Sequence, residues 1–134
     1  MPLTRITVRE GMSDARLQQL SALYHQTLVE VFDVPPEDKF QILEALPARA
    51  LVYHPHYQTG RRDGDFILFQ ILAGKPRSTA VKQRLYERLY ERLAERLHAD
   101  LGIHPDNLMV VIQLNGSEEW SFGRGLMFRQ EVSL

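Results

Sequence analysis

The sequence contains no cysteine, which excludes disulfide bonds, thiolate metal sites and cysteine nucleophiles. It also lacks an excess of either charge, because 16 lysines and arginines stand against 17 aspartates and glutamates, for a formal net charge of −1. A protein with so little net charge has no overall field that attracts nucleic acid or an anionic membrane. We therefore expect neither nucleic acid nor a membrane among its partners.

Long apolar runs and familiar catalytic signatures are absent as well. No apolar segment approaches the ~18 residues of a membrane-spanning helix, and no charged-then-apolar leader opens the chain. A cytoplasmic protein is the expectation. The patterns G-x-S-x-G, G-x-x-x-x-G-K-[ST] and H-E-x-x-H do not occur. His54 and His56 stand two apart with no third ligand suggested, so we predict no metal site and no cofactor.

The hydrophobic pattern predicts a strand, a helix and a strand, and then the same order again. Alternation from Leu3 to Arg9 is typical of a half-buried strand, and helical spacing follows from a cap at Ser13 to about Phe32. In the second half, Ser78 is the expected cap of a helix that Gly102 ends after about Leu101. The other predicted strands are residues 40–46, 65–73 and 108–114. Between 47 and 65 we expect a long loop, with a hairpin at GRRDGD.

The two halves resemble each other, since VPPEDKFQIL in the first matches IHPDNLMVVIQL in the second. We therefore predict one α/β (α+β) domain over 1–134, with pseudo-repeats at about 2–46 and 65–114, each a β-α-β unit with a right-handed crossover. Two such units give a four-stranded sheet with both helices on one face. The other face needs cover, which predicts a homo-oligomer, and the segment 115–134 would supply part of that cover or clasp a neighbour.

The stretch GKPRS follows a buried strand and precedes a helix, which is where open α/β sheets commonly bind ligands. Lys75 and Arg77 lie two apart there, so both side chains could hold a carboxylate beside the helix N-terminus. A solvated basic turn is the alternative. His25 lies near the apolar stripe of the first helix, where it is either a partly buried structural histidine or a residue that points into a pocket.

Pro2 is the other candidate for chemistry. Proline is tolerated at the first residue of a strand, so Pro2 could simply open the first strand. If Met1 is removed, however, Pro2 becomes a free secondary amine that can act as a base or nucleophile. Antiparallel pairing of the first and third strands would place this amine beside Lys75 and Arg77.

Four short motifs, MPL, FDVPPEDKFQ, KPRS and WSFGRG, occur in an order and spacing that resemble the tautomerase superfamily. The resemblance covers nearly the whole chain and is greatest to the malonate semialdehyde decarboxylase group. It implies β-α-β units assembled as trimers, with a catalytic amino-terminal proline exposed by methionine removal.

By that resemblance, Pro2 corresponds to the catalytic proline and Asp38 to an acid that works with it and a water. Arg77 matches the second of two arginines that bind the substrate carboxylate. Lys75 stands where the first of these arginines is expected. A lysine keeps the positive charge but lacks the two-pronged guanidinium that can bind both oxygens of a carboxylate. The remaining substrate-binding candidates are His25, from its place on the first helix, and the aromatics Trp120 and Phe122, which match residues beside the site.

The expected substrate is a small oxo acid. Cationic neighbours lower the pKa of the Pro2 amine and favour a neutral base for keto–enol tautomerisation, whereas Asp38 favours a charged amine. A charged Pro2, or an imine formed by its neutral fraction, would provide the electron sink for decarboxylation of a 3-oxo acid. The alternative is a non-catalytic oligomer that binds small anions or serves as an interaction module, especially if Met1 is retained.

Overall fold

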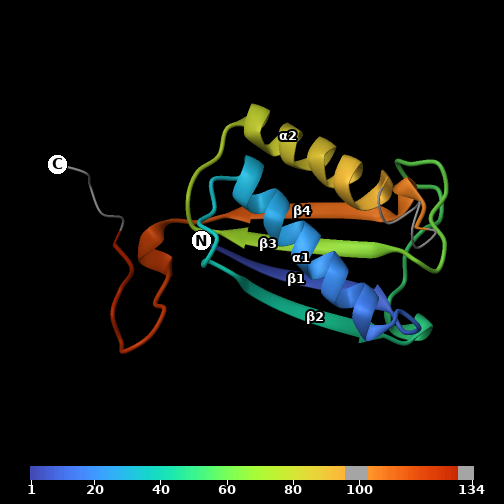
Figure 1. Ribbon diagram of the computed structural model, residues 1–134, viewed down its shortest axis with the longest axis horizontal. Helices are drawn as coiled ribbons and strands as arrows, with labels where there is room; N and C mark the ends of the chain where they lie inside the picture. Colours follow the sequence, from blue (N-terminus) through green and yellow to red (C-terminus); the bar gives the residue numbers. More distant parts are fainter. Residues whose placement is uncertain (96–102, 130–134) are drawn as a thin grey trace.

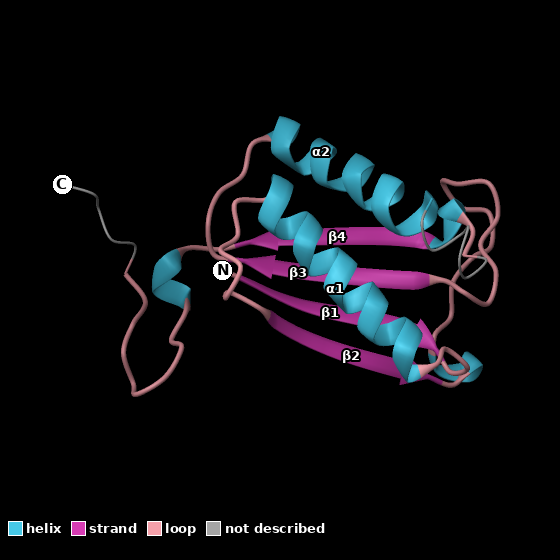
Figure 2. Cartoon of the chain, in the orientation of Figure 1, coloured by secondary structure: helices cyan, strands magenta, loops and turns pink. Residues whose placement is uncertain are grey.

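The computed structural model describes residues 1–95 and 103–129, and the predicted order of elements is confirmed. Both helices lie on the same face of a four-stranded sheet (Figures 1 and 2). The elements are β1 (Pro2–Arg9), α1 (Asp14–Val31), β2 (Phe40–Leu46), β3 (Ile67–Ala73), α2 (Thr79–Leu89) and β4 (Leu108–Leu114).

The strand order is β2-β1-β3-β4, with β1 parallel to β2 and β3 parallel to β4. The two β-α-β units meet where β1 pairs with β3 in antiparallel orientation. In that register Pro2 lies opposite Ala73. The start of the chain therefore lies beside the strand end that leads into Gly74 and Lys75, as the sequence predicted (Figure 1).

Both helices begin at the predicted serine caps. The Ser13 hydroxyl accepts a hydrogen bond from the Arg16 backbone N–H, and the Ser78 hydroxyl accepts one from the Val81 N–H, each at 3.2 Å. Such caps satisfy amide groups that the first helical turn leaves without partners. After α2 a π-helical segment runs from Tyr90 to Glu95. The predicted helix end at Leu101 and Gly102 lies outside the described residues.

The hydrophobic core lies between the two helices and the sheet. Tyr24 of α1 stacks on Phe69 of β3 with ring centroids 5.1 Å apart, and both are fully buried. The Tyr24 hydroxyl meets the buried Thr4 hydroxyl of β1 at 2.6 Å, so the polar end of this ring is satisfied inside the core. Other fully buried residues are Ile6, Leu20, Leu28, Phe32, Ile67, Leu85, Leu89 and Leu93.

The prediction of a hairpin at residues 60–65 is wrong. That stretch forms no strand pairing, and the long loop instead holds one short 3-10 helix at Ala48–Ala50. The Asp106 carboxylate, far away in sequence, accepts hydrogen bonds from the Thr59 hydroxyl at 2.8 Å and the Arg61 N–H at 2.9 Å. A distant side chain therefore satisfies polar groups of this loop without a partner strand.

The sheet face opposite the helices carries large apolar side chains that remain open. Phe40, Ile42, Met109 and Val111 are all more than a third exposed. The C-terminal segment continues from β4 past the start of β1 and extends beyond the end of the sheet (Figure 1). None of the helices in the described part of the chain has the length and apolar character needed to cross a membrane.

Candidate active site

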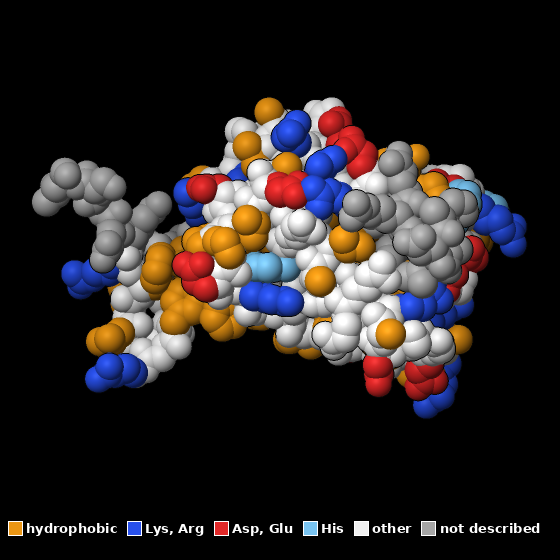
Figure 3. All heavy atoms as spheres, viewed as in Figure 1, with side chains coloured by type: hydrophobic (Ala, Val, Ile, Leu, Met, Phe, Trp, Pro, Cys, Tyr) orange, Lys and Arg blue, Asp and Glu red, His pale blue; other side chains and the backbone are white. Residues whose placement is uncertain are grey.

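A cavity of about 530 Å³ opens at the end of the molecule where β1 begins. Hydrophobic side chains gather at this end in the space-filling view (Figure 3). A largely apolar wall with a few convergent charged groups is typical of a small-molecule site. The lining residues are Met1, Val29, Asp33, Val34, Pro35, Asp38, Phe40, Lys75, Phe122 and Phe128.

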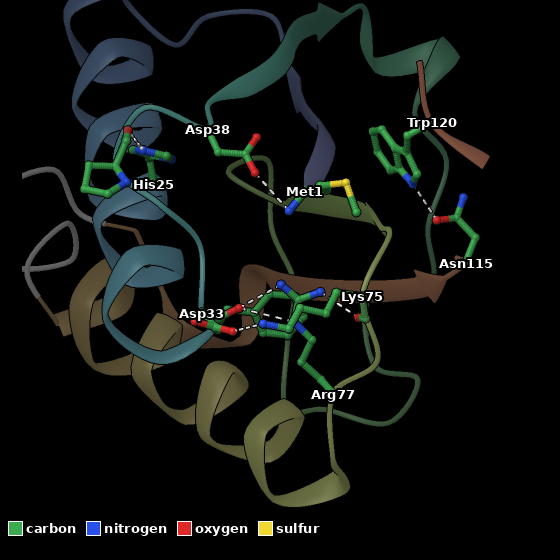
Figure 4. Close-up of polar contacts among 10 residues, drawn as sticks. Met1, His25, Asp33, Asp38, Lys75, Arg77, Asn115 and Trp120 are labelled. Carbon is green, nitrogen blue, oxygen red and sulfur yellow. Dashed lines mark hydrogen bonds and ion pairs between the residues drawn. The ribbon is translucent and has the colours of Figure 1, made fainter. Parts of the chain in front are cut away.

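Asp38 lies against the start of the chain. Its Oδ2 is 2.9 Å from the terminal nitrogen of Met1, and both side chains are at most 15% exposed (Figure 4). The other oxygen, Oδ1, is buried and has no hydrogen-bond partner among the described residues. The Asp38 N–H donates to Pro35 O at 3.0 Å, which places the carboxylate on a tight turn. The structure thus brings Asp38 to the amino terminus.

Pro2 itself is buried at the start of β1, and its nitrogen is an amide because Met1 precedes it. The Met1 carbonyl accepts a hydrogen bond from the Gly74 N–H at 3.0 Å. Met1 also lines the cavity. Met1 therefore occupies space directly beside the proline nitrogen.

Lys75 and Asp33 form an ion pair at the wall of the cavity (Figure 4). The Lys75 side chain is 39% exposed and that of Asp33 is 73% exposed. The hydrogen bond from Lys75 holds the pKa of Asp33 below its usual range. Lys75 is therefore at the predicted place, but it already has an anionic partner.

Arg77 faces the end of α1 rather than the cavity wall. Its Nε and Nη2 donate to Phe32 O at 3.2 and 2.9 Å, and its Nη1 donates to Lys75 O at 2.6 Å. The guanidinium also lies 4.3 Å from the centroid of the Phe32 ring. Burial lowers the pKa of Arg77. Lys75 and Arg77 were expected to project side by side, and they do not. Lys75 lines the cavity, whereas Arg77 lies beneath the turn.

The aromatic residues form a connected wall. Trp120 donates from Nε1 to Asn115 Oδ1 at 2.7 Å and stacks on Phe122 with centroids 5.8 Å apart. Phe122 in turn contacts Phe40 at 5.6 Å and Phe128 at 5.3 Å. Phe122 lines the cavity directly, whereas Trp120 supports it from behind through this stack.

The histidines have structural contacts. His25 Nε2 lies 2.7 Å from Pro36 O and so ties α1 to the turn that carries Asp38. His54 Nδ1 accepts a hydrogen bond from the His56 N–H at 3.0 Å within the long loop. In the described ranges no three His, Asp or Glu side chains come together as a metal site.

Sequence reasoning missed Asp33, Phe40 and Phe128 as lining residues. A signal existed for Asp33, which stands between the end of a helix and Pro35 and Pro36 and has a positive φ of 55°. Aspartate is one of the few residues besides glycine that adopt this conformation, so an Asp just before such a turn is a reasonable candidate.

Comparison with known proteins gives consistent results. Residues 38–123 match the model of a family described as "Tautomerase enzyme". The probable tautomerase YusQ of Bacillus subtilis (strain 168) is 32% identical over 125 residues, covering 93% of this chain and 95% of that protein. The probable tautomerase YrdN of the same organism is 33% identical, with 93% of each chain covered.

Solved structures share the fold over nearly the whole chain. Malonate semialdehyde decarboxylase, whose structures concern its decarboxylase and hydratase activities, aligns with a TM-score of 0.80 and 28% identity, covering 93% of each chain. A fused 4-OT that forms a symmetric trimer aligns with a TM-score of 0.73 and 18% identity, covering 93% of this chain and 94% of the other.

Proposed function

The chain belongs to the tautomerase family, and from this premise we propose that Pro2, freed by removal of Met1, acts through its amine on a small oxo acid. The observation that carries the proposal is the 2.9 Å contact between Asp38 and the amino-terminal nitrogen at the wall of a cavity that also bears Lys75. An acid, an amine and a cation around one cavity are the parts that proton transfer next to a carbonyl requires.

Removal of Met1 would change the site in three ways. The terminal amine would move to Pro2, whose Cα lies ~3.8 Å further along the chain. The Gly74 N–H would lose its acceptor, the Met1 carbonyl, and become available to a substrate oxygen. The cavity would also gain the space that Met1 now fills.

Two related reactions fit this arrangement. In tautomerisation, a neutral Pro2 takes a proton from the carbon beside the carbonyl, which leaves an enolate. It then returns the proton to the enolate oxygen, which gives the enol, or to another carbon of a conjugated enolate. In decarboxylation, a protonated Pro2 polarises the 3-oxo group, the C–C bond to the carboxylate breaks, and its electron pair becomes an enolate that is then protonated. Asp38 favours the protonated amine and Lys75 the neutral one, so we propose that both reactions occur.

The substrate carboxylate is proposed to bind Lys75. Phe122, on which Trp120 stacks, would then lie along the carbon chain of the substrate. Arg77 would hold the turn that carries Lys75 in place. The similarity to malonate semialdehyde decarboxylase, at 28% identity over 93% of both chains, supports a 3-oxo acid. The two Bacillus relatives support the tautomerase reaction.

A second candidate function rests on the same contact. If Met1 stays in place, the Pro2 nitrogen remains an amide with no basicity and Asp38 stays paired with the Met1 ammonium. The protein would then be an oligomeric module that binds small anions at Lys75 without turnover.

We also propose that the protein is a homotrimer that buries the open sheet face. The exposed Phe40, Ile42, Met109 and Val111 provide apolar area on that face. The symmetric trimer of the fused 4-OT, which shares the fold, supports this assembly.

The deciding experiment is the intact mass of untagged protein, combined with assays on phenylenolpyruvate and acetoacetate. We expect a mass short by one methionine, turnover of at least one compound, and loss of at least about 10²-fold in Pro2→Ala, as for removal of a general base. Glu37→Gln, a change on the exposed side of the same turn, is the control and should keep full activity. Retention of Met1 without turnover would favour the anion-binding module.

A further inference from the structure

Lys75 is the one basic side chain among the described residues that line the cavity, and Asp33 is bound to it. We propose that Asp33 is a built-in competitor for the substrate carboxylate, which must displace it from Lys75 in order to bind. This inference rests on the proposed function and adds a residue that sets the affinity and charge preference of the site.

The backbone at Asp33 holds the carboxylate at the cavity. Its φ of 55° lies in the left-handed region, which is unfavourable for most residues and persists only when the surroundings impose it. The neighbours on both sides impose it here, since Phe32 is fully buried and Val34 is 3% exposed. Arg77 adds two hydrogen bonds to the Phe32 carbonyl. The main chain is therefore fixed, while the side chain faces the opening.

The same geometry allows Asp33 to leave. Its side chain is 73% exposed, so the carboxylate can rotate into water without burial of an unpaired charge. Exposed ion pairs are weak because water and salt screen them. A substrate carboxylate that also contacts the aromatic wall gains contacts that Asp33 lacks, so it can take over Lys75.

The charges around the cavity explain why this competition affects selectivity. Asp33 and Asp38 balance Lys75 and the terminal ammonium, so the empty cavity has no excess of positive charge. One carboxylate can replace Asp33 on Lys75. A second carboxylate on the same substrate would meet Asp33 and Asp38 with no further cation on the wall, so we expect monocarboxylates to be preferred over dicarboxylates.

Asp33 competes as an ionised carboxylate near neutral pH. The contact with Lys75 keeps its pKa below the usual range, and Arg77 and the terminal ammonium act in the same direction. The carboxylate is therefore ionised near neutral pH, where an oxo acid is ionised too. Competition depends on ligand and salt, and protonation of Asp33 does not relieve it near neutral pH.

The test measures binding, so that it is independent of turnover. Dissociation constants of 2-oxobutyrate and 2-oxoglutarate are measured by calorimetry at low salt for the wild type and Asp33→Asn. Asparagine also tolerates positive φ, so the variant should keep the turn. We expect about two- to fivefold tighter binding of 2-oxobutyrate, the range for loss of one exposed ion pair, and a larger gain for 2-oxoglutarate.

Two controls isolate the contact with Lys75. Glu37→Gln makes the same change in net charge on the exposed side of the turn and should leave both dissociation constants unchanged. In a Lys75→Met background, Asp33→Asn should lower the dissociation constant of 2-oxobutyrate by no more than Glu37→Gln does.

Equal affinities in the wild type and Asp33→Asn would overturn the inference and leave the proposed function intact. If neither oxo acid binds to any of the proteins while all remain folded, the proposed function is overturned as well.

Discussion

Gly74 joins the start of the chain to the aromatic wall, and its lack of a side chain is required there. A Cβ at this position would lie 2.7 Å from Met1 Cε and 2.8 Å from Trp120 Cδ1. Met1 is flexible and can move. Trp120 cannot move easily, because Asn115 and Phe122 hold its ring.

We therefore expect Gly74→Ala to lower the free energy of unfolding by about 1–3 kcal/mol, as overpacking does, and to shift the emission of the single tryptophan. Urea unfolding followed by fluorescence measures both effects. Gly116→Ala is the matched control, since nothing lies within 4 Å of its Cβ position, and its stability should change by less than about 0.5 kcal/mol. A Gly74→Ala protein with wild-type stability and emission would contradict this packing.

At the scale of residues, the sequence located part of the site. Lys75 could be predicted from its place at the turn between a strand and a helix, whereas Asp38 was predicted only from the resemblance of PPEDKF to the tautomerase superfamily. The strand order then brings both turns to one cavity. The arrangement of Arg77 could not be found, because its partner is the Phe32 carbonyl at the end of a helix 45 residues away. Likewise, nothing in local spacing shows that Asp33 binds Lys75.

At the scale of elements, the limits of a strand or helix are predicted well where the residues that determine them are close together in the sequence. Strands β2 and β4 have the predicted limits of 40–46 and 108–114, since proline turns before them and alternating or apolar runs define both. The third strand begins at Ile67 instead of residue 65. The long loop was predicted, but the hairpin within it was wrong, because Asp106, which binds the loop, is remote in sequence.

The bond between Tyr24 and Thr4 connects α1 to β1 inside the core and gives a second prediction. Tyr24→Phe removes the hydroxyl 2.6 Å from Thr4 Oγ1 and leaves that buried group without this partner. We expect a loss of about 1–3 kcal/mol in the free energy of unfolding at pH 7. Denaturant titration measures it, and Tyr57→Phe, at an exposed tyrosine, serves as the control.

The same pair predicts how stability changes at high pH. Burial raises the pKa of Tyr24 far above the ordinary tyrosine value. Above ~pH 10 the unfolded chain therefore loses this proton while the folded chain keeps it, and this group's contribution to stability falls by up to ~1.4 kcal/mol per pH unit. Tyr24→Phe has no such ionising group. The difference in the free energy of unfolding between the wild type and this variant should therefore become smaller above pH 10. A constant difference would show that Tyr24 ionises normally in the folded protein.

At the scale of the whole molecule, the internal repeat predicted the topology. Two β-α-β units with both helices on one face leave the other face of the sheet open, and the structure has that arrangement (Figure 2). The C-terminal segment extends beyond the sheet end and packs Phe122 on Phe40. It therefore covers one end of the open face and leaves Met109 and Val111 exposed.

The proposed trimer can be tested on this face. Val111 lies in the middle of β4 on the open side and is 47% exposed, so Val111→Glu would place a charge inside the proposed interface without disturbing the helix-side core. By light scattering after gel filtration, we expect the wild type at three times the chain mass of 15.5 kDa and Val111→Glu at the mass of one chain. Gln26→Glu, on the exposed side of α1, adds the same charge and should remain trimeric. Circular dichroism checks that both variants fold. If Val111→Glu folds and remains a trimer, the interface lies elsewhere on the molecule. An uncompensated carboxylate buried among apolar side chains costs more free energy than such an interface can offset.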